Sequence, residues 1–242
     1  MNPAADLRIL FHLLRGQRRD GSHAQRLDSF YAPQADSYDA FREKLLHGRE
    51  ALIARLAPPP NARVLELGCG TGRNIEFFGD QIGTLASLEL VDLCAPLLLH
   101  ARRRAARWPS VVSVVEADLE RYRPSQPVDC VYLSYSLSMT SNWKKTIFNA
   151  VRMLRPGGTL GVVDFFVSEA APPPGEARHG WISRHFWPRW FAHDGVHISP
   201  LHLRALADCT DLVHLEQHTA PVPWLPLARV PYYVYVGRKR RN

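Results

Sequence analysis

A glycine-rich loop between an apolar strand and a helix is the feature that most constrains the fold of this chain. The segment V-L-E-L-G-C-G-T-G ends at Gly72 and begins within an expected strand at 63–67. Glycines at alternate positions let the backbone turn sharply and approach a ligand closely, because no side chain stands in the way. The loop therefore predicts a βα unit with a ligand bound above the turn.

Strand and helix patterns alternate along the rest of the chain. Expected strands are 63–67, 85–91, 111–116, 128–133, 159–165, 213–218 and 232–237, and expected helices are 74–78, 96–107, 143–154 and about 200–209. Such alternation is typical of βαβ units. We predict an α/β, Rossmann-like fold with a seven-stranded, mostly parallel sheet whose last strand is antiparallel.

An N-terminal helical cap, residues 1–60, is expected to form part of the same domain as residues 61–242. Its main helix, 35–56, stops before Pro58, Pro59 and Pro60, which cannot continue a helix. A shorter amphipathic helix at 6–15 either covers the core or lies on an anionic membrane surface. An aromatic-rich lid or insertion is expected at about 168–198.

Two carboxylates follow the next two expected strands. Asp92 ends the second strand, and Asp118 follows the third. The carboxyl ends of parallel strands share one edge of a sheet, so both side chains are expected beside the glycine loop. There Asp92 would accept hydrogen bonds from two ribose hydroxyls and Asp118 from an adenine amino group.

A dinucleotide oxidoreductase would share the loop and the ribose acid, but Gly-Cys-Gly-Thr-Gly-Arg lacks the last glycine spacing of G-x-G-x-x-G. Glu66, Asp118 and the turn L-R-P-G-G-T-L at 154–160 together resemble the class I S-adenosylmethionine-dependent methyltransferases over about 63–165. The resemblance implies the methyltransferase fold, S-adenosylmethionine as cofactor and S-adenosylhomocysteine as product. It also implies that Glu66 lies near the methionine end of the cofactor.

Cofactor contacts are therefore expected from the loop, from the strand ends and from the cap. Tyr38 and Arg42 are four residues apart on the expected cap helix, so they share a face that could hold the cofactor's carboxylate. The complete expected set is Tyr38, Arg42, Glu66, Gly68, Cys69, Gly70, Thr71, Gly72, Asp92, Leu93, Asp118, Leu119 and Ser134.

Charge and cysteine content limit the partners and the compartment. The net charge of +7 suits an anionic partner, whether nucleic acid or acidic lipid, or no specific partner. Base and amide methyltransferases often carry an Asn/Asp-Pro-Pro-aromatic motif after the fourth strand; this chain reads L-S-Y-S-L-S-M at 133–139, so we expect no nucleic acid.

Four scattered cysteines indicate a reducing compartment and no metal site. Without a recognisable signal sequence or spanning segment, we expect a cytoplasmic protein.

Two segments resemble one particular family. They are F-Y-A-P-Q-A-D-S-Y-D-A-F-R-E-K-L-L-H-G-R-E at 30–50 and L-S-Y-S-L-S-M at 133–139, and both are similar to the diacylglyceryl-homoserine N-methyltransferases of betaine-lipid synthesis. That family has Ile-Pro and an acidic residue where this chain has Thr140, Ser141 and Asn142. The resemblance implies three methylations of a diacylglyceryl-homoserine lipid at the inner face of a membrane. Expected partners are that lipid, an anionic membrane surface bound peripherally, and the homoserine-transferring enzyme.

Two other functions remain open from the sequence. One is another phospholipid or small-molecule amine methyltransferase, for example one that acts on phosphatidylethanolamine. The other is a cofactor-binding module without catalysis, against which the intact glycines and both carboxylates argue. The acceptor, unlike the cofactor, therefore depends on family resemblance.

Methyl transfer to an amine sets modest demands on the acceptor site. An in-line displacement needs a neutral, aligned and desolvated amine rather than a strong base, and aromatic faces bind the cationic products. Tyr31 and Tyr135 are the expected catalytic aromatic residues, with packing of the cap as the alternative for each. Asp164, at the end of the fifth strand, is either a proton acceptor or a structural hydrogen-bond partner.

Three further residues are candidates for acceptor binding. Arg49 in the cap helix would pair with the homoserine carboxylate, unless it is simply exposed. Trp181 and His185 belong to the aromatic and basic segment W-I-S-R-H-F-W-P-R-W-F at 181–191. That segment suits a lipid interface or tunnel mouth, or else a lid with ordinary aromatic packing.

Overall fold

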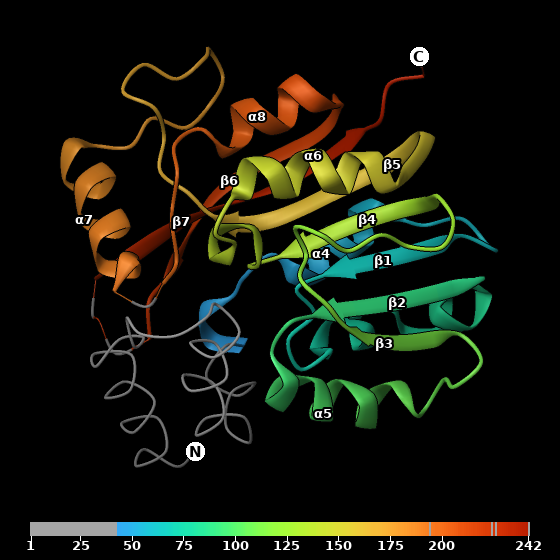
Figure 1. The fold of residues 1–242 in the computed structure, drawn as a ribbon. Helices are drawn as coiled ribbons and strands as arrows, with labels where there is room; N and C mark the ends of the chain where they lie inside the picture. The colour runs from blue at the N-terminus through green and yellow to red at the C-terminus, as the bar shows by residue number, and fades with distance from the viewer. Residues whose placement is uncertain (1–42, 194, 224, 226, 242) are drawn as a thin grey trace, which may run out of the picture.

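A computed structural model describes residues 43–193, 195–223, 225 and 227–241 of the chain. A single sheet forms its centre, with strands in the order β3-β2-β1-β4-β5-β7-β6 (Figure 1). The strand bounds are β1 Arg63–Leu67, β2 Ser87–Asp92, β3 Val112–Glu116, β4 Val128–Ser134, β5 Leu154–Phe165, β6 Asp211–Pro221 and β7 Arg229–Arg238. β1 to β5 run parallel, whereas β7 lies antiparallel between β5 and β6. The predicted fold class is confirmed.

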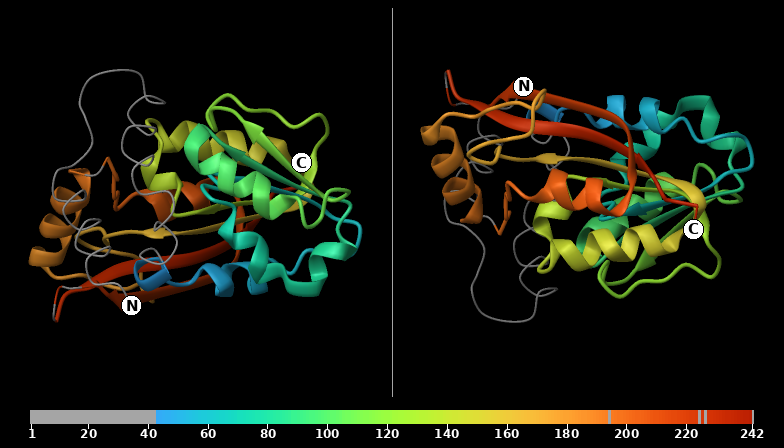
Figure 2. Two further views of the ribbon diagram at one scale, coloured as in Figure 1. Left: turned by 90° about the horizontal axis from the view of Figure 1, so that it is seen from below. Right: turned by 90° about the horizontal axis from the view of Figure 1, so that it is seen from above.

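Helices cover both faces of this sheet (Figure 2). α4 (Arg49–Leu56), the 3-10 helix η2 (Arg73–Thr84) and α5 (Ala95–Ala105) contribute Ile53, Ile75 and Leu98 to one buried cluster. α6 (Trp143–Met153) and α8 (His202–Cys209) contribute Ile147 and Leu206 to the other. The central strands are consequently buried on both sides: every residue of β1 after Arg63 is buried, and the residues of β4 are buried or half-buried.

Local sequence accounts for the start of α6 and for the side that it buries. The side chain of Asn142 accepts a hydrogen bond from the Lys145 N–H at 3.0 Å, which satisfies a donor that the first helical turn leaves free. Ile147, Ala150 and Met153 then recur at the helical spacing and are buried against the sheet. This one apolar stripe orients α6 and, with it, the loop that precedes it.

Two expected helices differ from those observed. The helix expected over 35–56 is interrupted within its described part, because α4 starts at Arg49 after Gly48, whose φ is +78°. Glycine adopts this left-handed conformation without strain, and a Cβ there would lie 2.7 Å from the Tyr232 ring. The helix after the glycine loop is a 3-10 helix, and Gly79 (φ 52°, ψ −134°) kinks it.

The last third of the chain adds α7 (Trp181–Ala192), which lies beyond the carboxyl ends of the parallel strands (Figure 1). It falls within the region where a lid or insertion was expected. Trp187 and Phe191 form the buried side of this helix. The ring of Phe191 stacks on that of Phe165 at the end of β5, with 4.7 Å between the ring centroids. Among the described residues, no helix has the length and apolar character needed to cross a bilayer.

Candidate active site

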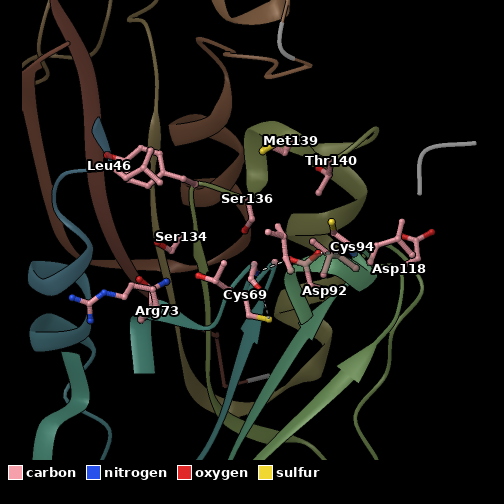
Figure 3. A pocket seen from close by; sticks show the side chains of 18 of the residues that line it. Leu46, Cys69, Arg73, Asp92, Cys94, Asp118, Ser134, Ser136, Met139 and Thr140 are labelled. Atoms are coloured by element: carbon pink, nitrogen blue, oxygen red, sulfur yellow. Dashed lines mark hydrogen bonds between the residues drawn. The ribbon is translucent and has the colours of Figure 1, made fainter. Parts of the chain in front are cut away.

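A cavity opens at the carboxyl ends of β1, β2 and β4, where the glycine loop was expected to hold a ligand (Figure 3). It encloses about 1050 Å³ of empty space, a figure that includes the solvent at its open mouth. Asp92, Cys94 and Asp118 lie toward one end, and Leu46 and Arg73 lie toward the other (Figure 3). The lining is Leu46, Arg49, Gly68, Cys69, Gly70, Thr71, Arg73, Asn74, Asp92, Leu93, Cys94, Leu97, Asp118, Leu119, Glu120, Ser134, Tyr135, Ser136, Met139, Thr140 and Ser141.

The glycine loop forms one wall of the cavity. Gly68 has a φ of +80°, and a Cβ there would lie 2.3 Å from the Ser136 Cβ, so only glycine fits. Gly70 has a φ of +54°, and a Cβ would meet only Leu97, at 3.9 Å. A side chain at Gly70 would therefore extend into open space on the ligand side. Gly72, also expected to bind the cofactor, is not a lining residue.

Asp92 joins the end of β2 to this loop. Its Oδ2 accepts a hydrogen bond from the Gly70 N–H at 2.8 Å, and its Oδ1 accepts one from the Cys94 N–H at 2.9 Å. Each carboxylate oxygen can accept a second hydrogen bond. The carboxylate is therefore fixed in position at the cavity wall, on the side where the hydroxyl groups of a ligand would bind.

Asp118 and the two residues after it form a neighbouring turn. The Asp118 Oδ1 accepts from the Glu120 N–H at 2.9 Å. Glu120 in turn accepts from the Ser141 hydroxyl at 2.5 Å and from the Asn142 N–H at 2.8 Å. This contact connects the β3 end to the segment at 140–142, where the chain departs from the betaine-lipid family pattern.

Glu66 lies behind the cavity wall and is not a lining residue, although it was expected near the ligand. Its side chain is fully buried and accepts hydrogen bonds from Asn74 Nδ2 at 2.7 Å and from the Tyr132 hydroxyl at 2.8 Å. Burial raises the pKa of Glu66 to about 7, against the opposing effect of these two donors. The lining residue is Asn74, and Glu66 fixes the orientation of its amide.

Two buried polar atoms in the wall have no hydrogen-bond partner among the described residues: Asn74 Oδ1 and Ser134 Oγ. Both belong to residues that line the cavity. An unsatisfied buried oxygen costs about 1–3 kcal/mol, which a ligand donor would recover. The hydroxyl-accepting Asp92, the open space at Gly70 and these two atoms fit a polar ligand such as a nucleoside with an amino-acid group.

Tyr135 lines the cavity at the end of β4, as expected, in a strained backbone conformation. Its φ is +53°, which costs a residue other than glycine on the order of 1–3 kcal/mol. The hydroxyl donates to the His47 carbonyl at 2.7 Å, and the ring packs on Phe165 with 4.6 Å between centroids. Burial raises the pKa of Tyr135 well above its usual value, so the phenol is neutral.

Asp164 is fully buried and is not a lining residue. Its Oδ2 accepts from the Ser138 N–H at 2.9 Å, and its Oδ1 accepts from the Ser138 hydroxyl at 2.7 Å and from the Phe165 N–H at 2.8 Å. Burial raises its pKa to about 6 despite these donors. Of the two expected roles, the structure favours the structural one. Asp164 fixes the short 3-10 helix η3 (Leu137–Met139) beside the cavity.

The other expected site residues separate into three groups. Arg49 lines the cavity, with its Nε donating to the Leu46 carbonyl at 3.1 Å and its guanidinium over the Phe77 ring. Trp181 and His185 contact each other on α7, with 4.5 Å between their ring centroids, and are not lining residues. The remaining three, Tyr31, Tyr38 and Arg42, lie outside the described residues.

Several lining residues were missed from the sequence, among them Asn74, Glu120, Met139 and Ser141. Glu120 had a local signal, because it lies two residues after Asp118 on the same turn. Met139 had only the resemblance of 133–139. Ser141, which lies beyond that segment, and Asn74 had no signal, since polar residues are common near the start of a helix. Within the described ranges, no group of three or more His, Cys, Asp or Glu side chains is arranged to hold a metal ion.

Comparison with known proteins identifies the fold. Residues 64–158 match a family model described as a methyltransferase domain. A phosphoethanolamine N-methyltransferase 2 from Haemonchus contortus, solved with phosphomonomethylethanolamine and S-adenosylhomocysteine, superimposes with a TM-score of 0.69 at 14% identity, over 92% of this chain and 61% of that one. The chain has the class I methyltransferase fold.

Another structure with this fold is the N-methyltransferase NodS from Bradyrhizobium japonicum in complex with S-adenosylhomocysteine, with a TM-score of 0.59 at 19% identity, over 79% of this chain and 85% of that one. By sequence, malonyl-[acyl-carrier protein] O-methyltransferase from Enterobacter lignolyticus is 30% identical over 65% of this chain. The ubiquinone/menaquinone C-methyltransferase UbiE from Bordetella parapertussis is 26% identical over 70% of this chain and 67% of its own length.

The chain spans only part of several of these relatives. It covers 59% of the O-methyltransferase, and 4% of the lovastatin diketide synthase lovF of Aspergillus terreus, to which it is 32% identical over 43% of this chain. The relatives methylate carbon, oxygen and nitrogen atoms according to their names. They therefore agree on the methyltransferase fold and differ in the acceptor.

Proposed function

We propose that this protein is an S-adenosylmethionine-dependent N-methyltransferase that converts diacylglyceryl-homoserine to its trimethylated betaine lipid. The predicted cofactor is confirmed by the methyltransferase-domain match over 64–158 and by the fold neighbours that hold S-adenosylhomocysteine. The observation that carries the proposal is the cavity at the strand ends, in which Asp92 at the end of β2 and Asp118 after β3 lie beside the glycine loop. The cofactor supplies an electrophilic methyl group there.

The chain's residues divide the cavity into two regions. Asp92, Leu93 and Asp118 suit the nucleoside, and Asn74 and Ser134 carry the buried oxygen atoms that suit a donor-rich group such as an amino acid. The acceptor would enter from the opposite region, which Leu46, Tyr135 and Met139 line with apolar and aromatic groups. Such a lining excludes water and tolerates a methylated ammonium ion against an aromatic face.

The lining supports a reaction that needs no strong base. Among its described residues there is no histidine or lysine, and the neutral phenol of Tyr135 donates its hydrogen bond to the His47 carbonyl. An amine acceptor that enters neutral requires alignment rather than proton abstraction. Arg49 remains our candidate for pairing with the homoserine carboxylate, because it lines the cavity as a cation next to Leu46.

The choice of lipid acceptor is supported by the resemblance of 30–50 and 133–139 to the betaine-lipid family. The second segment forms the cavity wall, since Ser134, Tyr135, Ser136 and Met139 are lining residues. The differing residues at 140–142 have a role of their own here, because Ser141 and Asn142 bind Glu120. We therefore regard this difference from the family as compatible with the same acceptor.

Purified protein should be incubated with S-adenosylmethionine and diacylglyceryl-homoserine in detergent micelles, with the methylated lipids resolved by mass spectrometry. We expect mono-, di- and trimethylated products, and none from an Asp92→Ala variant. Phosphatidylethanolamine offered in parallel tests the other acceptor class. Methylation of that lipid alone would replace the proposed acceptor, and cofactor binding without transfer to any amine would indicate a non-catalytic module.

A further inference from the structure

The outward face of α7 exposes apolar side chains together. Trp181 is 68% exposed, Ile182 75% and Phe186 42%. A helix turns by 100° per residue, so these three residues and Arg189 lie on one side of α7. Trp187 and Phe191 lie on the opposite, buried side. Other exposed apolar residues, such as Leu99 on α5 and Phe148 on α6, lie on different elements. Soluble surfaces seldom gather large apolar side chains in this way without a partner.

The buried side of α7 is joined to the cavity by stacked rings. Phe191 stacks on Phe165 at 4.7 Å, and Phe165 packs on the lining residue Tyr135 at 4.6 Å. After the helix, the His197 N–H donates to the Ser138 carbonyl at 2.7 Å, next to the lining residue Met139. α7 is therefore attached to the acceptor end of the cavity, beyond the strand ends (Figure 1).

The segment that carries this face is basic. α7 itself has two arginines, Arg184 and Arg189, and no acidic residue, and Arg178 lies shortly before it. Arg178 and Arg189 are exposed; Arg178 lies three residues before Trp181, and Arg189 lies on the same side of α7 as the exposed apolar residues. Aromatic and aliphatic groups flanked by arginine are suited to an anionic lipid surface, where the apolar groups enter the acyl boundary and the cations remain at the headgroups. A protein partner would not require this combination.

We propose that Trp181, Ile182 and Phe186, with Arg178 and Arg189, form a docking surface for an anionic lipid membrane. The proposal rests on the proposed function, because a lipid acceptor must reach the cavity from a bilayer. Docking through α7 would hold the acceptor end of the cavity at the headgroup layer, so that a headgroup enters while the acyl chains remain in the lipid.

The test is sedimentation of the full chain with vesicles of phosphatidylcholine, alone or mixed with phosphatidylglycerol. We expect binding to the mixed vesicles, weakened by salt because exposed charges are screened. A Trp181→Ser, Ile182→Ser variant should bind roughly tenfold or more weakly, since two inserted apolar side chains are lost. The matched control, Leu99→Ser with Phe148→Ser, removes side chains that are 57% and 59% exposed and should bind like the unmodified protein.

The charges are tested in the same assay. Arg178→Ala with Arg189→Ala should weaken binding and reduce its salt dependence, whereas Arg103→Ala with Arg204→Ala, also exposed, should not. All variants should bind S-adenosylmethionine with unchanged affinity, which establishes that they are folded. Vesicle binding by the unmodified protein does not depend on which acceptor is methylated, so the two proposals can fail separately.

Two results would overturn the docking proposal. One is equal vesicle binding by the Trp181/Ile182 variant and its control. The other is a protein that self-associates and does not bind vesicles, and that becomes monomeric when Trp181 and Ile182 are replaced. That result would assign the surface to a second copy of the chain.

Discussion

Two glycines, Gly68 in the loop and Gly83 in η2, provide a matched test of single residues. Gly68 combines a φ of +80° with a Cβ position 2.3 Å from Ser136, whereas Gly83 has open space around its Cβ position. We expect Gly68→Ala to lower the free energy of unfolding by about 2–5 kcal/mol and to weaken cofactor binding. Gly83→Ala should change stability by no more than about 1 kcal/mol. Urea denaturation and calorimetry measure both, and equal effects would contradict the close contact at Gly68.

The buried carboxyl group of Glu66 should make stability depend on pH. Its pKa in the folded protein is about 7, above the usual 4.5, so the folded state retains a proton that the unfolded state releases. The free energy of unfolding should therefore fall as the pH rises between these values, by on the order of 3 kcal/mol. Glu66→Gln should remove this decrease and leave the comparable one that comes from Asp164, whose pKa rises from 3.8 to about 6.

Urea denaturation at several pH values compares Glu66→Gln with Glu50→Gln, whose side chain is exposed. The control should keep the pH dependence of the unmodified protein. If Glu66→Gln keeps it too, Glu66 is ionised throughout and the cause lies elsewhere.

The positions of Asp92 and Asp118 at the cavity could be predicted from the sequence. Both residues lie at the ends of expected parallel strands, and such ends meet at one edge of a sheet. They did not reveal how deep Glu66 lies. Its depth depends on Asn74 from η2 and Tyr132 from β4, and the second contact joins residues 66 positions apart. The strained backbone at Tyr135 was equally hidden, since its cause is packing on Phe165 and a hydrogen bond to His47.

At the scale of elements, η3 owes its position to Asp164. Asp164→Ala would leave the N–H groups of Ser138 and Phe165 without their acceptor, at about 1–3 kcal/mol for each buried group. We expect η3 to shift and the KM for the acceptor to rise, with cofactor affinity unchanged. Ser138→Ala removes one hydroxyl donor and should have a smaller effect. Steady-state kinetics tests this, and an equal loss of cofactor affinity would contradict a role confined to the acceptor side.

Strands were predicted closely because their apolar runs are short and bounded by turns. Helices near the cavity were less predictable. The break before α4 is stabilised by Gly48 against Tyr232, a contact between residues far apart in sequence. The kink in η2 needs the unusual backbone of Gly79, with φ 52° and ψ −134°.

At the scale of the whole molecule, the order of the strands predicts how protection is distributed. β4 and β5 lie in the interior of the sheet, while β3 and β6 form its edges. Amide hydrogen exchange followed by mass spectrometry should find the slowest exchange in β4 and β5 and faster exchange in β3 and β6, because edge amides open without unfolding the centre. Slower exchange in β6 than in β5 would contradict a single cooperative sheet.

The antiparallel insertion of β7 has a consequence for synthesis. β6 is made before β7 but joins the sheet only through it, since β7 pairs with both β5 and β6. While the ribosome is still translating Arg229–Arg238, the preceding strand has no partner, and the edge of β5 is open to other chains. We therefore expect the nascent chain to reach its folded state only after β7 has emerged from the ribosome. Until then a chaperone could protect the open edge of β5.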